Sequence, residues 1–124
     1  MEERSELIEL HKRLSKTLDE EREAAKEKRH EKGYLTAREN LENLVDEGSF
    51  VEYGQLAIAA QKSRRKLDEL RTETAADGII TGCGKINSKI LDSKKALSAI
   101  IINDYSVLAG TQGYYHHKKL DRIC

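Results

Sequence analysis

The feature that most constrains the fold is a largely apolar, β-branched run at residues 99–108, in a chain that is otherwise highly charged. Such a run is typical of a strand buried on both faces, because apolar and polar residues stop alternating where neither face meets water. A second β-type run, residues 79–86, is interrupted by Gly82 and Gly84, which indicates a bulge or a close backbone approach. We therefore expect a small sheet whose core strand is residues 99–108.

Helical periodicity governs the first part of the chain. Apolar side chains recur every three or four positions at Leu7, Leu10, Leu14 and Leu18. This spacing predicts one long amphipathic helix over residues 5–32, whose second half projects from the body because the apolar stripe thins there. We accordingly divide the chain into an N-terminal helix, residues 1–32, and a body, residues 33–124.

A capping box predicts the start of a second helix. Thr36 and Glu39 have the spacing at which the threonine oxygen accepts from the amide of Glu39, while the Glu39 side chain accepts from the amide of Thr36. We expect a short helix to start directly after Thr36 and to bury Leu41, Leu44 and Val45.

The remaining segments are expected as follows. Residues 46–49 form a turn and residues 50–53 a strand, because the latter alternate apolar and polar side chains. Residues 61–74 are highly charged, which predicts a surface helix or a mobile insertion. Residues 115–123 open another helix, and the chain ends within it.

A core strand followed by half a helix leaves the sheet without the neighbour that a strand-helix-strand unit supplies. The chain therefore looks truncated, and we expect weak stability in isolation. We expect apolar faces to be left uncovered at Ile100, Ile102, Tyr105 and Val107.

Composition excludes several classes of function. The 124 residues, 38% of them hydrophobic, suffice for one domain at most. The 22 basic and 22 acidic residues balance, so no bulk charge favours nucleic acid or a membrane surface. No apolar run approaches a membrane span or a signal peptide. We expect a cytoplasmic protein in which Cys83 and Cys124 are free thiols, because their spacing fits neither zinc nor disulfide frameworks.

Three segments together carry a resemblance to a known family. They comprise residues 33–39 with 44–52, residues 77–87, and residues 104–113 with 116–119. Each alone is a weak signal, whereas their order and spacing are specific. The chain resembles the N-terminal part of the carboxyltransferase domain of biotin-dependent acyl-CoA carboxylases. It departs from the family pattern at Asn40, where a second arginine is usual, and at Cys83, where a large hydrophobic residue is frequent.

The resemblance implies an α/β (α+β) fold, namely part of a crotonase-like (ClpP-like) domain. It also implies a share in transferring carboxylate from carboxybiotin to an acyl-CoA such as acetyl- or propionyl-CoA. In the family, backbone amides of a glycine-rich turn beyond the third segment stabilise the acyl-CoA enolate. No Gly-Gly pair occurs in this chain. We therefore expect it to hold no catalytic residue and to bind no cofactor itself.

The implied partners are acyl-CoA, the biotin carboxyl carrier and biotin carboxylase components, and further copies of the same enzyme. Carboxybiotin is expected to reach the site from a partner domain. Neither nucleic acid nor a membrane is expected as a partner.

Two places in the chain are candidate ligand contacts. Gly110, Thr111, Gln112 and Gly113 lie between a strand and a helix, where backbone amides can meet the phosphates or pantetheine of coenzyme A. The alternative is an ordinary turn, in which glycine supplies positive φ. Arg38 either holds a loop near the CoA site or binds carboxylates within the fold, and we favour the latter.

Other candidates are weaker. Lys62, Arg64, Arg65 and Lys66 can neutralise phosphates, but a solvated helix face is the simpler interpretation. The adjacent pair at residues 116–117 does not predict a metal site, since neighbouring helical side chains point about 100° apart.

Two alternative functions remain open on sequence alone. One is a non-catalytic helical scaffold that pairs through the Leu7 to Ala25 stripe. The other is a different crotonase-like acyl-CoA enzyme, such as a hydratase or a biotin-dependent decarboxylase.

Overall fold

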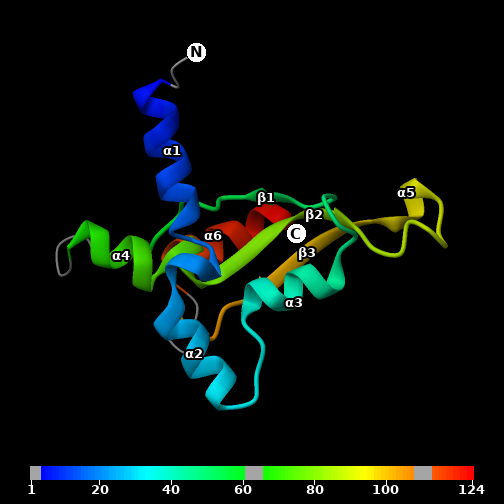
Figure 1. Ribbon diagram of the computed structural model, residues 1–124. Helices are drawn as coiled ribbons and strands as arrows, with labels where there is room; N and C mark the ends of the chain where they lie inside the picture. Colours follow the sequence, from blue (N-terminus) through cyan, green and yellow to red (C-terminus); the bar gives the residue numbers. More distant parts are fainter. Residues whose placement is uncertain (1–3, 61–65, 108–112) are drawn as a thin grey trace.

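The chain forms a three-stranded antiparallel sheet with helices on both faces and a helical N-terminal arm (Figure 1). The structure is a computed structural model and describes residues 4–60, 66–107 and 113–124. In chain order the elements are α1 (Ser5–Ser15), η1 (Asp19–Glu21), α2 (Glu23–Glu31), α3 (Ala37–Leu44), β1 (Val51–Tyr53), α4 (Leu67–Glu73), η2 (Ala75–Gly78), β2 (Ile79–Lys85), α5 (Ser93–Ala96), β3 (Leu97–Asn103) and α6 (Tyr114–Ile123).

Strand β2 is the centre of the sheet. It pairs with β1, with Cys83 opposite Val51, and with β3, with Gly82 opposite Ile100. A Cβ atom at Gly82 would lie 2.1 Å from the carbonyl oxygen of Val51. Only glycine therefore allows β1 to lie this near, and the close backbone approach expected from this run is confirmed.

The apolar core lies between α3 and one face of the sheet. Ala37 and Leu41 of α3 pack with Ile80 of β2 and Ile100 of β3. Partly buried Val45, Phe50, Ile86 and Ile102 surround this cluster.

The predicted capping box that starts α3 is confirmed. The amide of Glu39 donates to Thr36 Oγ1 over 3.0 Å, and the amide of Thr36 donates to Glu39 Oε1 over 2.9 Å. The expectation that Leu44 is buried is wrong, because its side chain is 45% exposed. Helix α3 is short and presents only Ala37 and Leu41 to the core, so its last turn faces solvent.

Helix α6 covers the other face of the sheet (Figure 1). Alternate residues of a strand point to opposite sides, so Ile79 and Thr81 face α6 whereas Ile80 faces α3. Ile79, Thr81 and His116 of α6 are each 1% exposed. The sheet is thus buried on both faces along β2.

The N-terminal arm is not the single long helix that the periodicity predicts. Helices α1 and α2 are separate helices with η1 between them (Figure 1). The break occurs where Arg22, which is 8% exposed, turns into the body with φ −127° and ψ 44°. Its guanidinium donates to the carbonyl of Thr72 over 3.0 Å and to Asp104 Oδ2 over 3.0 Å. These tertiary contacts override the local helical pattern.

Strand β3 also differs from expectation. Leu97 is 60% and Ile101 41% exposed, so the strand is buried on one face rather than two. Among the residues that the structure describes, β3 pairs with β2 alone. The expected exposure is wrong for Ile100 and Val107, which are 3% and 2% exposed, and is confirmed for Tyr105, which is 56% exposed.

The charged stretch before η2 contains α4, anchored by the fully buried Leu70. A surface helix is therefore confirmed for its second half, while Lys62, Arg64 and Arg65 lie outside the described residues. Within the described ranges, no helix has the length and apolar character that crossing a bilayer requires.

Candidate functional site

The predicted ligand-binding turn leads into α6, and its last residue, Gly113, is the N-cap of that helix. Gly110, Thr111 and Gln112 lie outside the described residues. Gly113 has φ −92°, so the positive φ considered for it is not present. The role of these four residues in binding coenzyme A stays a prediction.

The N-terminus of α6 is instead met by a carboxylate from the same chain. Asp77, which is 1% exposed, accepts a hydrogen bond from the amide of His116 at Oδ2 over 2.9 Å. A Cβ atom at Gly113 would lie 2.8 Å from Asp77 Oδ1. Negative charge near the amides of a first helical turn is stabilising. Gly113 therefore makes room for the Asp77 carboxylate.

Asp77 belongs to a strained turn. Ala76, Asp77 and Gly78 have φ values of 54°, 48° and 75° in succession. Left-handed conformations of residues other than glycine cost free energy and persist only where surrounding contacts hold them. Here α6 supplies those contacts: His116 Nδ1 lies 3.2 Å from the Asp77 carbonyl oxygen, and Lys119 Nζ donates to the Ala76 carbonyl over 2.9 Å.

Lys119 is the most perturbed cation of this region. Its Nζ also donates to the carbonyl of Ile79 over 2.5 Å. Burial disfavours its ammonium form and lowers the pKa of Lys119 to about 8, with the negative charge of Glu52 acting in the opposite direction. The side chain thus clamps α6 to the turn before β2.

Arg38 makes a two-point ion pair within the fold. Its Nη1 and Nη2 donate to the two carboxylate oxygens of Glu52 over 2.6 and 3.0 Å, and its Nε donates to the carbonyl of Thr17 over 3.3 Å. The side chains of Arg38 and Glu52 are only 12% and 8% exposed. Arg38 therefore binds a carboxylate of the same chain, while its position relative to the CoA site stays a prediction.

A cleft of about 580 Å³ opens between β1 and the last turns of α6. Two charged side chains described above, Glu52 and Lys119, line this cleft. The other lining residues are Tyr53, Gly54, Thr81, Arg122 and Ile123. Gly113 and Arg38 do not line this cleft. Lys119 does line it, and its ammonium group interacts with the charges of both Asp77 and Arg38.

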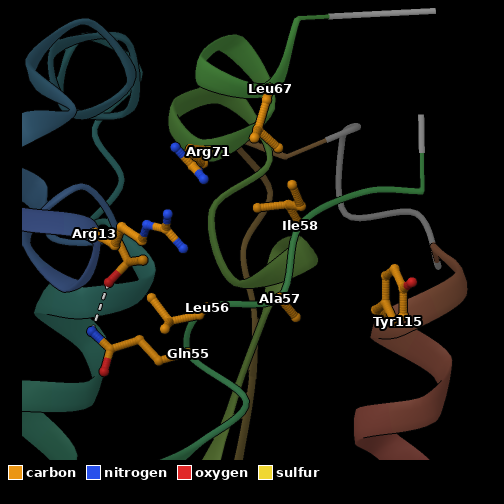
Figure 2. A pocket seen from close by; sticks show the side chains of 9 residues that line it. Arg13, Gln55, Leu56, Ala57, Ile58, Leu67, Arg71 and Tyr115 are labelled. Atoms are coloured by element: carbon orange, nitrogen blue, oxygen red, sulfur yellow. Dashed lines mark hydrogen bonds between the residues drawn. The ribbon is translucent and has the colours of Figure 1, made fainter. Parts of the chain in front are cut away.

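A groove of about 350 Å³ lies between α1, residues 55–58, α4 and α6. Figure 2 shows Arg13 and Arg71 on one side of it and Tyr115 on the other, with Leu56 and Ile58 between them. Both arginines already pair with carboxylates on their own helices, at distances of 2.9 and 3.4 Å. The groove therefore offers apolar surface rather than free positive charge.

The two adjacent histidines, His116 and His117, lie in different environments. His116 is buried against Asp77, whereas His117 is exposed and lies 3.5 Å from Asp121. In the described part of the chain, no group of three or more His, Cys, Asp or Glu side chains is placed to hold a metal ion. Cys83 is half-buried in β2.

Comparison with known proteins identifies the family. The family model described as "Carboxyl transferase domain" matches residues 28–124. This chain belongs to the carboxyl transferase domain family. The match includes all three segments that suggest the resemblance, and it begins inside α2.

Relatives of this carboxyl transferase chain are considerably longer. The biotin-dependent acetyl-/propionyl-coenzyme A carboxylase beta5 subunit of Mycobacterium tuberculosis is 37% identical over 94% of this chain and 20% of its own length. The structure of a single-chain, multi-domain long-chain acyl-CoA carboxylase matches with a TM-score of 0.94 and 48% identity over 98% of this chain and 12% of that one. The transcarboxylase 12S hexamer structure matches with a TM-score of 0.71 and 26% identity, covering 99% and 22%.

The chain thus spans about a fifth of the curated relatives that it matches. Its fold is that of the corresponding part of a carboxyl transferase domain, which confirms the expected crotonase-like class. The division at residue 33 stays a prediction.

Sequence reasoning missed the groups that organise this carboxyl transferase segment. Asp77 looks like an ordinary Asp-Gly turn residue, and Arg22 like one charge among several. Their partners lie 39 and 82 positions away in sequence. One available signal was the isolated arginine within the acidic run of residues 19–23.

Proposed function

We propose that this chain supplies the first part of the CoA-side domain of an enzyme that transfers carboxylate from carboxybiotin to an acyl-CoA such as acetyl- or propionyl-CoA. The observation that carries the proposal is the carboxyl transferase match over residues 28–124, together with relatives named as acetyl- or propionyl-CoA carboxylase subunits. The enzyme is proposed to work in the cytoplasm.

Carboxybiotin is the proposed co-substrate, brought by a biotin carboxyl carrier that a biotin carboxylase component loads. Three relatives bear "biotin-dependent" in their names, which supports this assignment. The enzyme is proposed to assemble from several copies, as the transcarboxylase 12S hexamer does. Exposed Leu7, Ile8 and Leu10 on α1 offer apolar surface for such assembly.

Within this scheme the segment at Gly110, Thr111, Gln112 and Gly113 contacts coenzyme A, and α6, which begins directly after Gly113, serves as a fixed support. Asp77 and Lys119 hold α6 against the central strand. The chain's own contribution is binding and orientation. The oxyanion amides and the biotin-side domain are supplied by the rest of the enzyme.

The test is a carboxylation assay on the protein as its gene encodes it, with its biotin carboxyl carrier and biotin carboxylase. Acetyl-, propionyl- and long-chain acyl-CoA are compared by incorporation of labelled bicarbonate, the last because of the 48% identical structure. We expect carboxylation of at least one of them. Absence of carboxylation combined with loss of carboxylate from a malonyl-type CoA ester would instead indicate a decarboxylase.

A matched control uses the 124 residues alone. We expect this chain to show no malonyl-CoA-dependent carboxylation of free biotin, because the groups that stabilise the enolate contribute a large part of the barrier lowering. Turnover above background by the chain alone would contradict the assignment of the oxyanion amides to other parts of the enzyme.

A further inference from the structure

Lys119 carries a nucleophilic nitrogen that the proposed reaction does not use. Its Nζ donates to the carbonyl oxygens of Ala76 and Ile79 over 2.9 and 2.5 Å. Both partners are uncharged and, among the described residues, no carboxylate lies within ion-pairing distance of this nitrogen. A neutral amine has two N–H bonds and can donate to both carbonyls, as the ammonium form does. The site therefore accepts the uncharged, nucleophilic form of the side chain.

The cleft between β1 and the last turns of α6 gives a small molecule access to this side chain. Lys119 lines the cleft, whose volume is about 580 Å³. Gly54 lies against the lysine stem, because a Cβ atom at Gly54 would be 3.1 Å from Lys119 Cε. A larger residue at this position would press on the stem from the cleft side. Glycine thus leaves room beside Lys119.

The charges that act on Lys119 come from three other elements. Burial has the largest effect and lowers its pKa to about 8. Glu52 of β1 and Asp77 of η2 act in the opposite direction, while Arg38 of α3 adds to the lowering. Glu52 is itself paired with Arg38 at 2.6 and 3.0 Å, and Asp77 accepts from the amide of His116. About half of the Lys119 side chains are therefore neutral at pH 8, and a desolvated neutral lysine is an effective nucleophile.

Arg122 supplies a cation beside this nucleophile. It follows Lys119 by three positions on α6, the spacing at which side chains on one helix face are neighbours, and it lines the same cleft. Arg122 is exposed and, within the described ranges, no carboxylate pairs with it. A guanidinium binds a planar carboxylate through two parallel N–H donors. The cleft thus combines a nucleophilic amine with a cation that is free to bind an anionic product.

We propose that dissolved carbon dioxide adds to Lys119 Nζ within this cleft to form a carbamate, and that the modification loosens α6 from the turn before β2. The amine lone pair forms the N–C bond, one C=O electron pair of carbon dioxide moves onto oxygen, and one proton leaves the nitrogen for water. No oxidant, reductant or further substrate is needed. The product is a planar anion of the kind that Arg122 can bind.

The modification changes how α6 is held. The lysine nitrogen donates to both the Ala76 and the Ile79 carbonyls, whereas a carbamate nitrogen keeps a single N–H bond. At least one carbonyl therefore loses its donor, which weakens the attachment of the helix. Carbon dioxide would in this way control how often α6 opens. The proposal goes beyond the proposed function, because it requires neither an acyl-CoA nor carboxybiotin.

The first test traps the carbamate on the protein as its gene encodes it. The protein is equilibrated at pH 8 with ¹³C-labelled bicarbonate and carbon dioxide, or with chloride at the same ionic strength. A trialkyloxonium salt converts carbamates to stable esters, and mass spectrometry of the digested protein locates the label. The internal control is Lys118, the exposed neighbour on the same helix. We expect at least about tenfold more label on Lys119 than on Lys118, because more of its amine is neutral at this pH.

The second test measures hydrogen–deuterium exchange in α6 with and without carbon dioxide. Loss of one hydrogen bond predicts an increase of about fivefold in the exchange of α6 amides when carbon dioxide is present. Lys119→Arg keeps a cation with several N–H donors but no nucleophile, and should abolish both the label and this increase. Arg122→Gln should lower the label on Lys119 about threefold, because it removes the cation that binds the product. Lys118→Arg is the matched control and should change neither readout.

Label on Lys119 that does not exceed the label on Lys118 would overturn the modification site. An equal response of α6 exchange to carbon dioxide in Lys119→Arg would overturn the release of the helix, since the gas would then act elsewhere. Oligomer size and the circular dichroism spectrum show whether each variant folds. The comparison of Lys119 with Lys118 in the unsubstituted protein needs no variant. Neither test involves carboxyl transfer, so both results are independent of the proposed function.

Discussion

The caps of helices α3 and α6 differ in how far along the sequence the capping residue lies from the helix. The first turn of α3 is capped by Thr36 and Glu39, three positions apart. The first turn of α6 is capped by Asp77, which lies 39 positions before His116. A cap built from neighbouring residues stabilises its helix alone, whereas a cap brought from a distant turn ties the helix to that turn. Thr36 Oγ1 also donates to Asp19 Oδ2, so the comparison predicts that damage at α3 reaches no further than the N-terminal arm and that damage at α6 reaches the sheet.

The largest effect is expected from Asp77→Ala. It removes the acceptor for the His116 amide and places alanine at φ 48°, so α6 should lose about 2–3 kcal/mol of local stability. Hydrogen–deuterium exchange in the full protein measures this as an increase of about a hundredfold in the amides of α6 and of the start of β2. Asp77→Asn keeps the acceptor and the tolerance for positive φ, and serves as the control. Unchanged α6 exchange in Asp77→Ala would contradict the role of this cap.

A somewhat smaller effect is expected from Gly113→Val. The new side chain meets the Asp77 carboxylate at 2.8 Å, which should cost about 1–3 kcal/mol and accelerate exchange in α6. We therefore expect a loss of stability in addition to any rise in KM for acyl-CoA. Combining Gly113→Ala with Asp77→Ser should cost less than the sum of the two single changes, because the smaller partner relieves the clash. Strict additivity would show that the two residues do not share this contact.

Thr36→Ala tests the local cap and should have a more modest effect. Loss of the hydroxyl acceptor for the Glu39 amide should destabilise α3 by about 1 kcal/mol, equivalent to about a fivefold rise in exchange of its first amides. Exchange in α6 should not change. A rise in α6 exchange of similar size would remove the distinction between the two helix starts.

The smallest expected effect is the pH dependence of the stability of α3. Hydrogen bonds from the Thr36 amide and from His30 lower the pKa of Glu39 to about 2 from an ordinary 4.5. The stabilisation of α3 is therefore complete above pH 4.5 and is lost as the pH falls toward 2. Exchange in α3 should accelerate over that window after correction for intrinsic rates. Glu39→Gln should flatten the dependence, with Glu42→Gln on the same helix as a control that leaves it intact.

The same comparison explains how much could be predicted from sequence. The capping box, the strand at residues 79–85 and the helix after Gly113 were found correctly, because each depends on neighbours within a few residues. The single helix over residues 5–32 was wrong, since Arg22 finds Thr72 and Asp104 far along the chain. Local periodicity carries no record of such partners.

For the candidate site, too, local sequence features could be predicted and contacts between distant residues could not. Motif order identified the family and pointed to the segment that ends at Gly113. It did not identify Asp77 or Lys119, whose function depends on the packing of α6 against the turn before β2. Burial and left-handed backbone geometry, which arise only in the folded chain, distinguish these residues.

Lys119 also gives the chain a chemical reporter. Its pKa of about 8 means that near this pH much of the side chain is an unprotonated amine, the form that attacks acylating reagents. The side chain also lines the cleft between β1 and α6, so a reagent can reach it in the folded protein. Pulse labelling with an amine-reactive ester at mildly alkaline pH, read out on the peptide that carries Lys119, should therefore modify this lysine faster than an exposed one, and the advantage should disappear in any variant that frees Lys119 from its burial.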